Sequence, residues 1–261
     1  MGTRLKQTFG SSVMASDGAP VAVVVGGSGG IGSEICRRLA TDGHRVIVGY
    51  ASNQERAESV AADLGDEHLA LRISATESES LNEARQTLED DFGRVDVLVN
   101  CAGVTRAVAH DDLDSLDDDL IDQIFAVNWR GPFATIRAMR TLLERSNDPV
   151  VINISSVAAV TGLGSNVAYC ASKAALDSLT RSLARSLAPT IRVVSVSPGW
   201  VEGEYAASMP EGFVDGQREA TPLKRLASPE NVAAAVSCVV SELKSTTGVA
   251  IPVDGGRPLG I

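Results

Sequence analysis

Short runs of valine, isoleucine and leucine alternate along most of the chain with longer segments whose apolar residues recur every three or four positions. The short runs predict buried strands, and the periodic segments predict helices with one apolar face. Strands are expected at residues 20–27, 45–50, 68–73, 94–100, 149–155, 191–197 and 249–254. Helices are expected at residues 30–42, 53–64, 78–91, 115–128, 131–145, 169–188 and 229–243. Residues 203–220 show no clear period, so no element is predicted there.

The alternation of strands with helices determines the expected fold class. It predicts an α/β fold in which seven strands form a mostly parallel, doubly wound open sheet flanked by helices. The 261 residues suffice for a sizeable core and no linker or repeat divides them, so a single domain is expected. Residues 1–19 contain no apolar signal-peptide core and are expected to form a flexible N-terminal extension before a domain at 20–261.

A glycine-rich segment, GGSGGIG (26–32), joins the first predicted strand to the first predicted helix. Glycines let the backbone turn tightly and approach a pyrophosphate, whose charge suits a helix N-terminus. The segment fits both G-x-G-x-x-G and G-x-x-x-G-x-G, so it predicts a dinucleotide site, with a ligand-free tight turn as the alternative. The residues expected to bind the cofactor here are Gly26, Ser28, Gly29, Gly30, Ile31 and Gly32.

The end of the second predicted strand bears on the choice of dinucleotide. A carboxylate there would bind the ribose hydroxyl of NAD and repel the 2′-phosphate of NADP. The sequence has no acidic residue at this point and offers Tyr50, Ser52 and Asn53, with Arg56 close by. These residues favour NADP(H) over NAD(H), and the first three are predicted to contact the cofactor.

Tyr169 and Lys173 are the first candidates for chemistry. They lie four residues apart in a predicted helix, so their side chains share one face one turn apart. A neighbouring ammonium favours the phenolate and is expected to lower the tyrosine pKa from about 10 toward the range of a general acid or base. The alternative is a surface helix with an unremarkable tyrosine and lysine.

Charge and composition exclude several classes of partner. The net charge of −10 argues against nucleic acid or an anionic membrane, and no apolar run reaches the length of a membrane span. The acidic segment 111–122 is interpreted as a solvated helix entry, and the three scattered histidines form no ligand pattern, so no metal site is expected. Four cysteines without a C-x-x-C spacing predict buried, reduced thiols and a cytoplasmic protein.

Several spaced motifs occur together and carry a family resemblance. They are VGGSGGIG (25–32), NCAG (100–103), VNWRG (127–131), a serine thirteen residues before YCASK (169–173), SPGWV (197–201) and PVDGG (252–256). The set resembles the short-chain dehydrogenase/reductase family from about residue 20 to residue 258. The resemblance implies that residues 20–261 form one Rossmann-type short-chain dehydrogenase/reductase domain.

The same resemblance implies catalytic roles for four residues. Tyr169 would exchange a proton with a carbonyl or alcohol oxygen, and Lys173 would lower the pKa of Tyr169 and bond the nicotinamide ribose. Ser156 would orient the substrate oxygen. Asn128 would hold a water that links Lys173 to solvent, although its residue type alone fits a polar position in a helix bend equally well.

The resemblance also implies the remaining cofactor contacts. Beside the glycine segment, they would come from the end of the fourth strand, from the catalytic helix and from the wall of the nicotinamide pocket. These residues are Asn100, Ala102, Gly103, Tyr169, Lys173, Pro198, Gly199 and Val201.

Two further segments, 49–58 and 221–233, resemble those of β-ketoacyl-acyl-carrier-protein reductases. They imply an NADP-dependent oxidoreductase that interconverts a ketone and a secondary alcohol, with a 3-oxoacyl thioester on acyl carrier protein or CoA as leading substrate. The alternatives are an NAD-dependent alcohol, sugar or steroid-type dehydrogenase and a non-catalytic dinucleotide-binding regulator. The family pattern also implies a homotetramer or homodimer assembled through the helices at 115–145 and 169–188.

Overall fold

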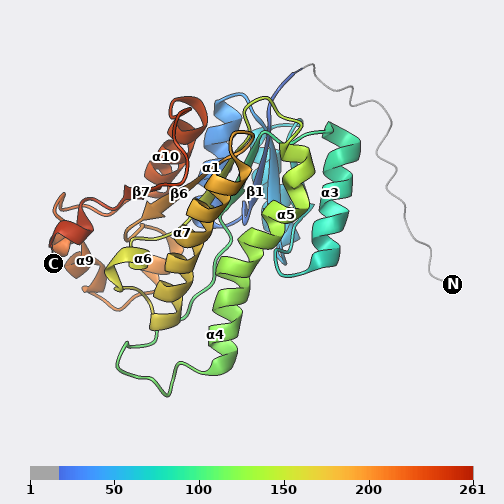
Figure 1. The fold of residues 1–261 in the computed structure, drawn as a ribbon. Coiled ribbons are helices and arrows are strands. Elements are labelled where there is room, and N and C mark those ends of the chain that lie inside the picture. Colours follow the sequence, from blue (N-terminus) through green and yellow to red (C-terminus); the bar gives the residue numbers. More distant parts are fainter. Residues whose placement is uncertain (1–17, 261) are drawn as a thin grey trace.

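A computed structural model describes residues 18–260, and within them seven strands form one sheet with the order β3-β2-β1-β4-β5-β6-β7 (Figure 1). The strands are β1 (Val21–Val25), β2 (Arg45–Tyr50), β3 (Leu69–Arg72), β4 (Val97–Asn100), β5 (Val150–Ile154), β6 (Arg192–Pro198) and β7 (Ala250–Val253). Every neighbouring pair is parallel, so the sheet predicted as mostly parallel is parallel throughout. The strand order reverses between β1 and β4, the kind of position at which such sheets bind ligands. The predicted extension at 1–19 falls largely on residues 1–17, outside the described residues.

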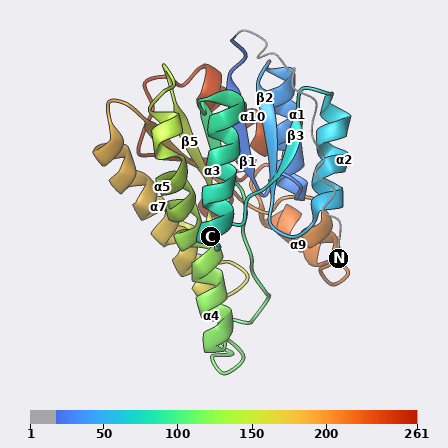
Figure 2. The same ribbon diagram turned by 90° about the vertical axis from the view of Figure 1, so that its right-hand side faces the viewer.

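Helices cover both faces of this sheet. They are α1 (Gly30–Thr41), α2 (Gln54–Leu64), α3 (Ser78–Phe92), α4 (Asp118–Phe125), α5 (Gly131–Leu143), α6 (Ala158–Thr161), α7 (Val167–Leu187), α8 (Glu204–Ala207), α9 (Phe213–Ala220) and α10 (Pro229–Ser241). Figure 2 shows α3, α5 and α7 on one side of the central strands and α1 and α2 on the other. No helix within residues 18–260 is long and apolar enough to cross a membrane.

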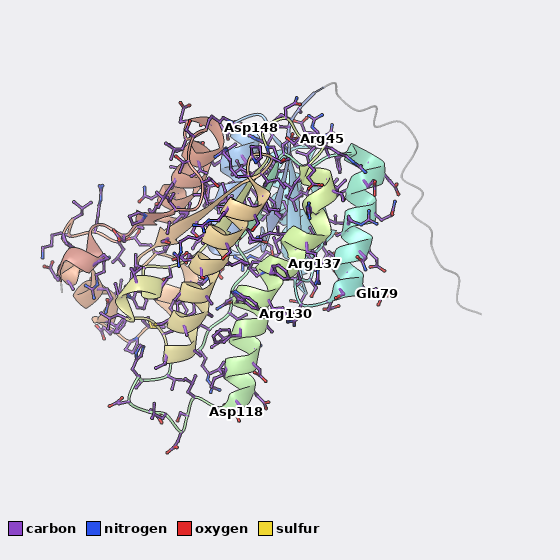
Figure 3. All side chains as sticks on the ribbon, in the orientation of Figure 1. Arg45, Glu79, Asp118, Arg130, Arg137 and Asp148 are labelled. Atoms are coloured by element: carbon purple, nitrogen blue, oxygen red, sulfur yellow. The ribbon has the colours of Figure 1, made fainter. Side chains whose placement is uncertain are left out.

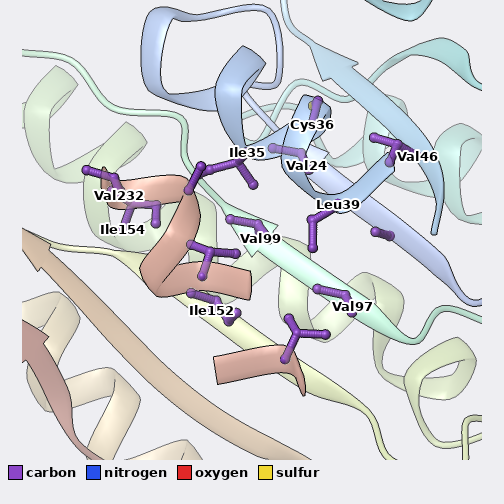
Figure 4. Close-up of a cluster of buried hydrophobic side chains, with 14 of the residues drawn as sticks. Val24, Ile35, Cys36, Leu39, Val46, Val97, Val99, Ile152, Ile154 and Val232 are labelled. Atoms are coloured by element: carbon purple, nitrogen blue, oxygen red, sulfur yellow. The ribbon is translucent and has the colours of Figure 1, made fainter. Parts of the chain in front are cut away.

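The core consists of two apolar layers that share the buried strand β1. Successive side chains of a strand point to opposite faces, so Val24 packs in the layer with Ile35, Leu39 and Val232 (Figure 4), whereas Val23 packs in the other. Full burial of one such aliphatic side chain contributes about 1.5–3 kcal/mol relative to exposure. The β-branched runs read from the sequence are therefore the strands buried on both faces.

The acidic segment predicted to open a helix at 115–128 folds differently. Asp117 caps a shorter helix, α4, by accepting a hydrogen bond from the Leu120 N–H at 2.8 Å, and Asp118 lies at its outer end (Figure 3). Carboxylates at this end are favoured by the helix dipole. After Phe125 the helix widens into a π-helical turn, Ala126–Arg130, before α5 begins. This turn points Asn128 into the protein, where it is fully buried.

The helix that carries Tyr169 and Lys173 begins two residues earlier than predicted. Asn166 caps α7 by accepting a hydrogen bond from the Tyr169 N–H at 2.6 Å. Its amide nitrogen also donates to the Arg106 carbonyl at 2.8 Å, so the cap attaches α7 to the loop after β4. A residue three positions before Tyr169 therefore sets where the helix starts.

The segment without a predicted element contains two short helices, α8 and α9, which lie beside the C-terminal end of the chain (Figure 1). The prediction of buried thiols is wrong for one cysteine. Cys36 and Cys170 are buried and Cys101 is partly so, but Cys238 on α10 is exposed. None of the four is in a disulfide.

Candidate active site

A cavity of about 860 Å³ opens beyond the carboxyl ends of β1, β4, β5 and β6. Its size suits a small-molecule or cofactor site. The predicted residues in its lining are Gly26, Gly29, Gly30, Ile31, Gly32, Gly103, Ser156, Tyr169, Lys173, Pro198, Gly199 and Val201. The predicted residues outside its lining are Ser28, Tyr50, Ser52, Asn53, Asn100, Ala102 and Asn128. The structure thus brings the glycine segment and the Ser156–Tyr169–Lys173 set together in one cavity.

The glycine segment forms a cradle that side chains would fill. A Cβ atom on Gly32 would lie 2.1 Å from the Gly26 carbonyl oxygen, and one on Gly26, at φ +79°, would lie 2.7 Å from the Ala102 nitrogen. These two glycines permit the turn itself. Gly29 precedes α1 without a side-chain cap, so the first N–H groups of the helix are available to an anion. The segment fits the pyrophosphate of a dinucleotide.

Gly30 can test whether a glycine is needed for ligand binding at a position where the turn itself does not need one. A Cβ atom there meets no atom within 4 Å, yet the residue lines the cavity. We expect Gly30→Ala to change the free energy of unfolding by less than about 0.5 kcal/mol. Because the added methyl group enters the cavity, cofactor binding should weaken about tenfold. Gly216→Ala in α9, which has the same free space away from the cavity, is the matched control, and equal binding by both variants would contradict the cradle.

Ser156, Tyr169 and Lys173 converge from two elements. Ser156 follows β5 directly, and its hydroxyl oxygen accepts a hydrogen bond from the Ala158 N–H at 3.1 Å. This leaves the Ser156 proton free to be donated, and the serine lies close enough to the Tyr169 phenol to oppose a rise of its pKa. Lys173 lies one turn along α7 with its amine 5.8 Å from the centre of the Tyr169 ring. Ser155 also lines the cavity, but it is buried and donates toward the Lys173 carbonyl at 3.4 Å; the choice of Ser156 over Ser155 stays a prediction.

Lys173 is an almost fully buried amine, 5% exposed, that donates to the Ile154 carbonyl at 2.8 Å. Burial disfavours its charge and lowers its pKa from 10.5 to about 8, against the opposing effect of Cys101 and Asp177. Burial also raises the pKa of Tyr169, an effect that Ser156 only partly opposes. The predicted depression of the tyrosine pKa is therefore wrong, because desolvation of the buried phenol is the largest effect and the Lys173 amine is not among the groups that lower the pKa.

Asn128 lies behind the cavity and is fully hydrogen-bonded to the protein. Its amide oxygen accepts from the Val104 N–H at 2.9 Å, and its amide nitrogen donates to the Val104 carbonyl at 3.0 Å and to Ser172 at 3.2 Å. A Cβ on Gly103 would lie 3.5 Å from this oxygen and 3.7 Å from the Lys173 amine, so both groups border the same small space. Asn128 positions the loop after β4 beside the lysine, and its role with a water stays a prediction.

A line of hydrogen-bonded, buried polar side chains, which was not predicted from the sequence, connects the elements that carry the site. Asn100 donates to Asn153 at 2.9 Å, Asn153 donates to Thr180 at 2.9 Å, and Thr180 and Ser195 share a hydrogen bond of 2.8 Å. The line joins β4, β5, α7 and β6. The detectable signal was a polar residue within each apolar strand run. The Asn100 amide oxygen is buried and has no partner among the described residues, which suits its predicted place beside the cofactor.

The residues predicted to contact the adenosine part of the cofactor lie around the start of α2. Asn53 caps this helix by accepting a hydrogen bond from the Arg56 N–H at 3.0 Å, and Ser52 is exposed beside it. The Arg56 side chain is engaged elsewhere, in an ion pair with Glu204 of α8. Local residue spacing carries no signal for this pair, because its members are 148 residues apart.

Three aromatic side chains cover the opposite end of the cavity. Trp200 stacks on Tyr205 with ring centres 5.9 Å apart and meets Phe213 edge-on at 5.2 Å. All three line the cavity; Tyr205 and Phe213 come from the segment that had no predicted element, and Trp200 lies just before it. Clusters of three or more potential metal ligands are absent from the part of the chain that the structure describes.

Comparison with known proteins agrees with this arrangement. The family model for enoyl-(acyl carrier protein) reductase matches residues 25–257. A protein assigned as ketoacyl reductase 2 of the granaticin polyketide synthase, from Streptomyces violaceoruber, is 38% identical over 94% of this chain and all of its own. The 3-oxoacyl-[acyl-carrier-protein] reductase of Aquifex aeolicus is 35% identical over 90% of this chain and 96% of its own.

A solved structure has the same fold with a cofactor bound. The 3-ketoacyl-(acyl-carrier-protein) reductase of Brucella melitensis, complexed with NADH, superposes with a TM-score of 0.83 at 30% identity, covering 91% of this chain and 98% of its own. The glycine cradle, the sheet order and these matches agree on one class of enzyme, an oxidoreductase that uses a nicotinamide dinucleotide. The chain belongs to the short-chain dehydrogenase/reductase family.

Proposed function

We propose that the protein reduces a ketone to a secondary alcohol with NADPH, and that 3-oxoacyl thioesters carried on acyl carrier protein or CoA are its leading substrates. One observation carries this proposal. Ser156 and Tyr169 both line the cavity that also contains the glycine cradle, and the serine side chain lies close enough to the phenol to affect its pKa. A carbonyl oxygen placed there would accept a hydrogen bond from both hydroxyls.

The residues of the chain have separate tasks in this reaction. The glycine segment, Gly103 and Pro198 would hold the dinucleotide, which supplies the hydride when bound. Ser156 would orient the carbonyl oxygen and stabilise the negative charge that develops on it. Tyr169 would give its proton to that oxygen, and the Lys173 ammonium would stabilise the phenolate that remains. In the reverse direction Tyr169 would take the proton back.

The choice of substrate rests on two kinds of support. Relatives named as ketoacyl and 3-oxoacyl reductases match nearly the whole chain. The aromatic cover of Trp200, Tyr205 and Phe213 provides an apolar surface on which an acyl chain or ring can pack.

An NAD-dependent dehydrogenase is the second candidate, and one observation favours it. Arg56, the cation closest in sequence to the expected ribose site, is already paired with Glu204. The Brucella relative was solved with NADH, which lacks the 2′-phosphate.

Cofactor oxidation tests these proposals directly. NADPH and NADH would each be supplied with a 3-oxobutanoyl thioester of N-acetylcysteamine and with alicyclic and aromatic ketones of similar size. We expect turnover of the thioester, with a higher kcat/KM for NADPH than for NADH. Cofactor binding without turnover of any ketone would favour the non-catalytic regulator instead.

Assembly and location belong to the same proposal. A homotetramer or homodimer through α4, α5 and α7 is supported by Trp129, which is 37% exposed although it stacks on Phe133. Light scattering coupled to size-exclusion chromatography would distinguish two and four copies from one. The four free cysteines support a reducing compartment such as the cytoplasm.

A further inference from the structure

An ion pair joins the start of α2 to a segment that lines the cavity. Arg56 in the first turn of α2 donates to both carboxylate oxygens of Glu204, with nitrogen–oxygen distances of 2.9 and 3.3 Å. Glu204 also lines the cavity that contains the glycine cradle. This two-pronged geometry is the one that guanidinium groups adopt with carboxylates and with phosphates.

The two partners have different positions in the molecule. Arg56 follows the end of β2, where an arginine accommodates the 2′-phosphate in proteins that bind NADP. Glu204 begins α8 in the segment that supplies Tyr205 and Phe213 to the aromatic cover. Figure 2 shows this segment, in orange, beneath α2. The pair therefore connects the start of α2 to the half of the cavity wall that carries the aromatic cover, the substrate half.

We propose that Glu204 sets the cofactor preference by competing with the 2′-phosphate of NADP for the Arg56 guanidinium, an inference that rests on the proposed use of NADP(H). The Glu204 carboxylate occupies the Nη1 and Nη2 donors of Arg56, so a phosphate that binds these same nitrogens must displace it. A phosphate monoester carries a charge of about −1.5 to −2 and is repelled by a carboxylate that stays nearby. Both side chains are open to solvent, at 42% and 77% exposure, so the existing pair is weak enough to be displaced. Glu204 thereby supplies, from the substrate half, the negative charge that is missing at the end of β2.

The surrounding charges provide a matched control. Glu202 lies in the same segment and carries the same charge, but its partner is Arg218 at 3.9 Å. Arg72 on the neighbouring strand is paired with Glu77 at 2.7 Å and so has its own acceptor. Removing the charge of Glu202 tests whether loss of any nearby carboxylate strengthens binding of a 2′-phosphate, or only loss of Glu204.

The test measures binding of adenosine 2′,5′-bisphosphate and adenosine 5′-monophosphate by calorimetry, because these probes differ at the 2′-position and need no turnover. At low ionic strength Glu204→Gln should tighten the bisphosphate about fivefold and leave the monophosphate unchanged. Glu202→Gln should leave both unchanged. Arg56→Ala should remove the preference for the bisphosphate, and Glu204→Gln should have no further effect in that background.

Other results overturn the inference in distinguishable ways. If Arg56→Ala weakens the bisphosphate but Glu204→Gln does not tighten it, competition fails while the use of NADP stands. If Glu202→Gln tightens the bisphosphate as much as Glu204→Gln does, the net charge of the region sets the affinity, and competition for the Arg56 guanidinium is not the cause. If Arg56→Ala leaves the preference for the bisphosphate intact, both the competition and the proposed role of Arg56 in NADP binding fail.

Discussion

Replacement of Tyr169 by phenylalanine is expected to lower kcat for ketone reduction by about 10²- to 10⁴-fold, the contribution typical of a positioned proton donor. The substitution removes one hydroxyl and keeps the ring, which is packed at the start of α7. Because the glycine cradle is untouched, the dissociation constant for NADPH should stay within about twofold of the wild-type value. Steady-state kinetics and fluorescence titration with NADPH provide the two measurements.

Tyr205 offers a matched control for this variant. It lines the same cavity, and its hydroxyl lies close enough to Ser165 for that serine to oppose the rise of its pKa. Tyr205→Phe is expected to change kcat by less than about threefold, since exposed or peripheral hydroxyls contribute little. Comparable losses in both variants, or an unchanged kcat in Tyr169→Phe, would mean that Tyr169 is not the proton donor.

Lys173 is expected to make the stability of the wild type depend on pH in a specific direction. The folded protein lowers its pKa from 10.5 to about 8, so below pH 8 the full cost of burying the ammonium is present. Between pH 8 and 10.5 the folded state releases this proton while the unfolded state keeps it, and the folded state is favoured as pH rises. Relative to Lys173→Met, the wild type should gain about 3 kcal/mol over this range.

Denaturant unfolding of both proteins at several pH values from 7 to about 10.5 measures this difference. Loss of the bond to the Ile154 carbonyl adds an offset that does not vary with pH, so the slope is the informative quantity. Tyr169 and Cys101 remain in both proteins and their own titrations largely cancel in the comparison. A difference that stays flat across the range would show that the Lys173 amine is solvated in the folded protein.

The parts of the fold that were predictable are those determined by local pattern. Runs such as residues 20–25 identify strands because both faces of the sheet are buried, and the glycine segment identifies its turn because side chains do not fit there. Tyr169 and Lys173 were predictable as neighbours because they occupy one helix. These features need no information about distant parts of the chain.

The parts that were missed depend on distant contacts or on the loss of water. Residues 203–220 have a weak intrinsic pattern, and their helices lie against the cavity through Tyr205 and Phe213. The pairing of Arg56 with Glu204 has no counterpart in local spacing. The pKa of Tyr169 was predicted to fall, but burial raises it. Helical spacing shows which side chains are neighbours and carries no information about how deeply they are buried.

The hydrogen-bonded line from Asn100 through Asn153 and Thr180 to Ser195 limits how this sheet can be redesigned. An apolar substitution at one position would leave the neighbouring polar groups without hydrogen-bond partners. Each buried group left unpaired would lower the free energy of unfolding by about 1–3 kcal/mol. Variants designed to change this part of the sheet should therefore replace all four polar side chains together. Libraries that vary these positions singly would discard solutions that are reached only by coordinated change.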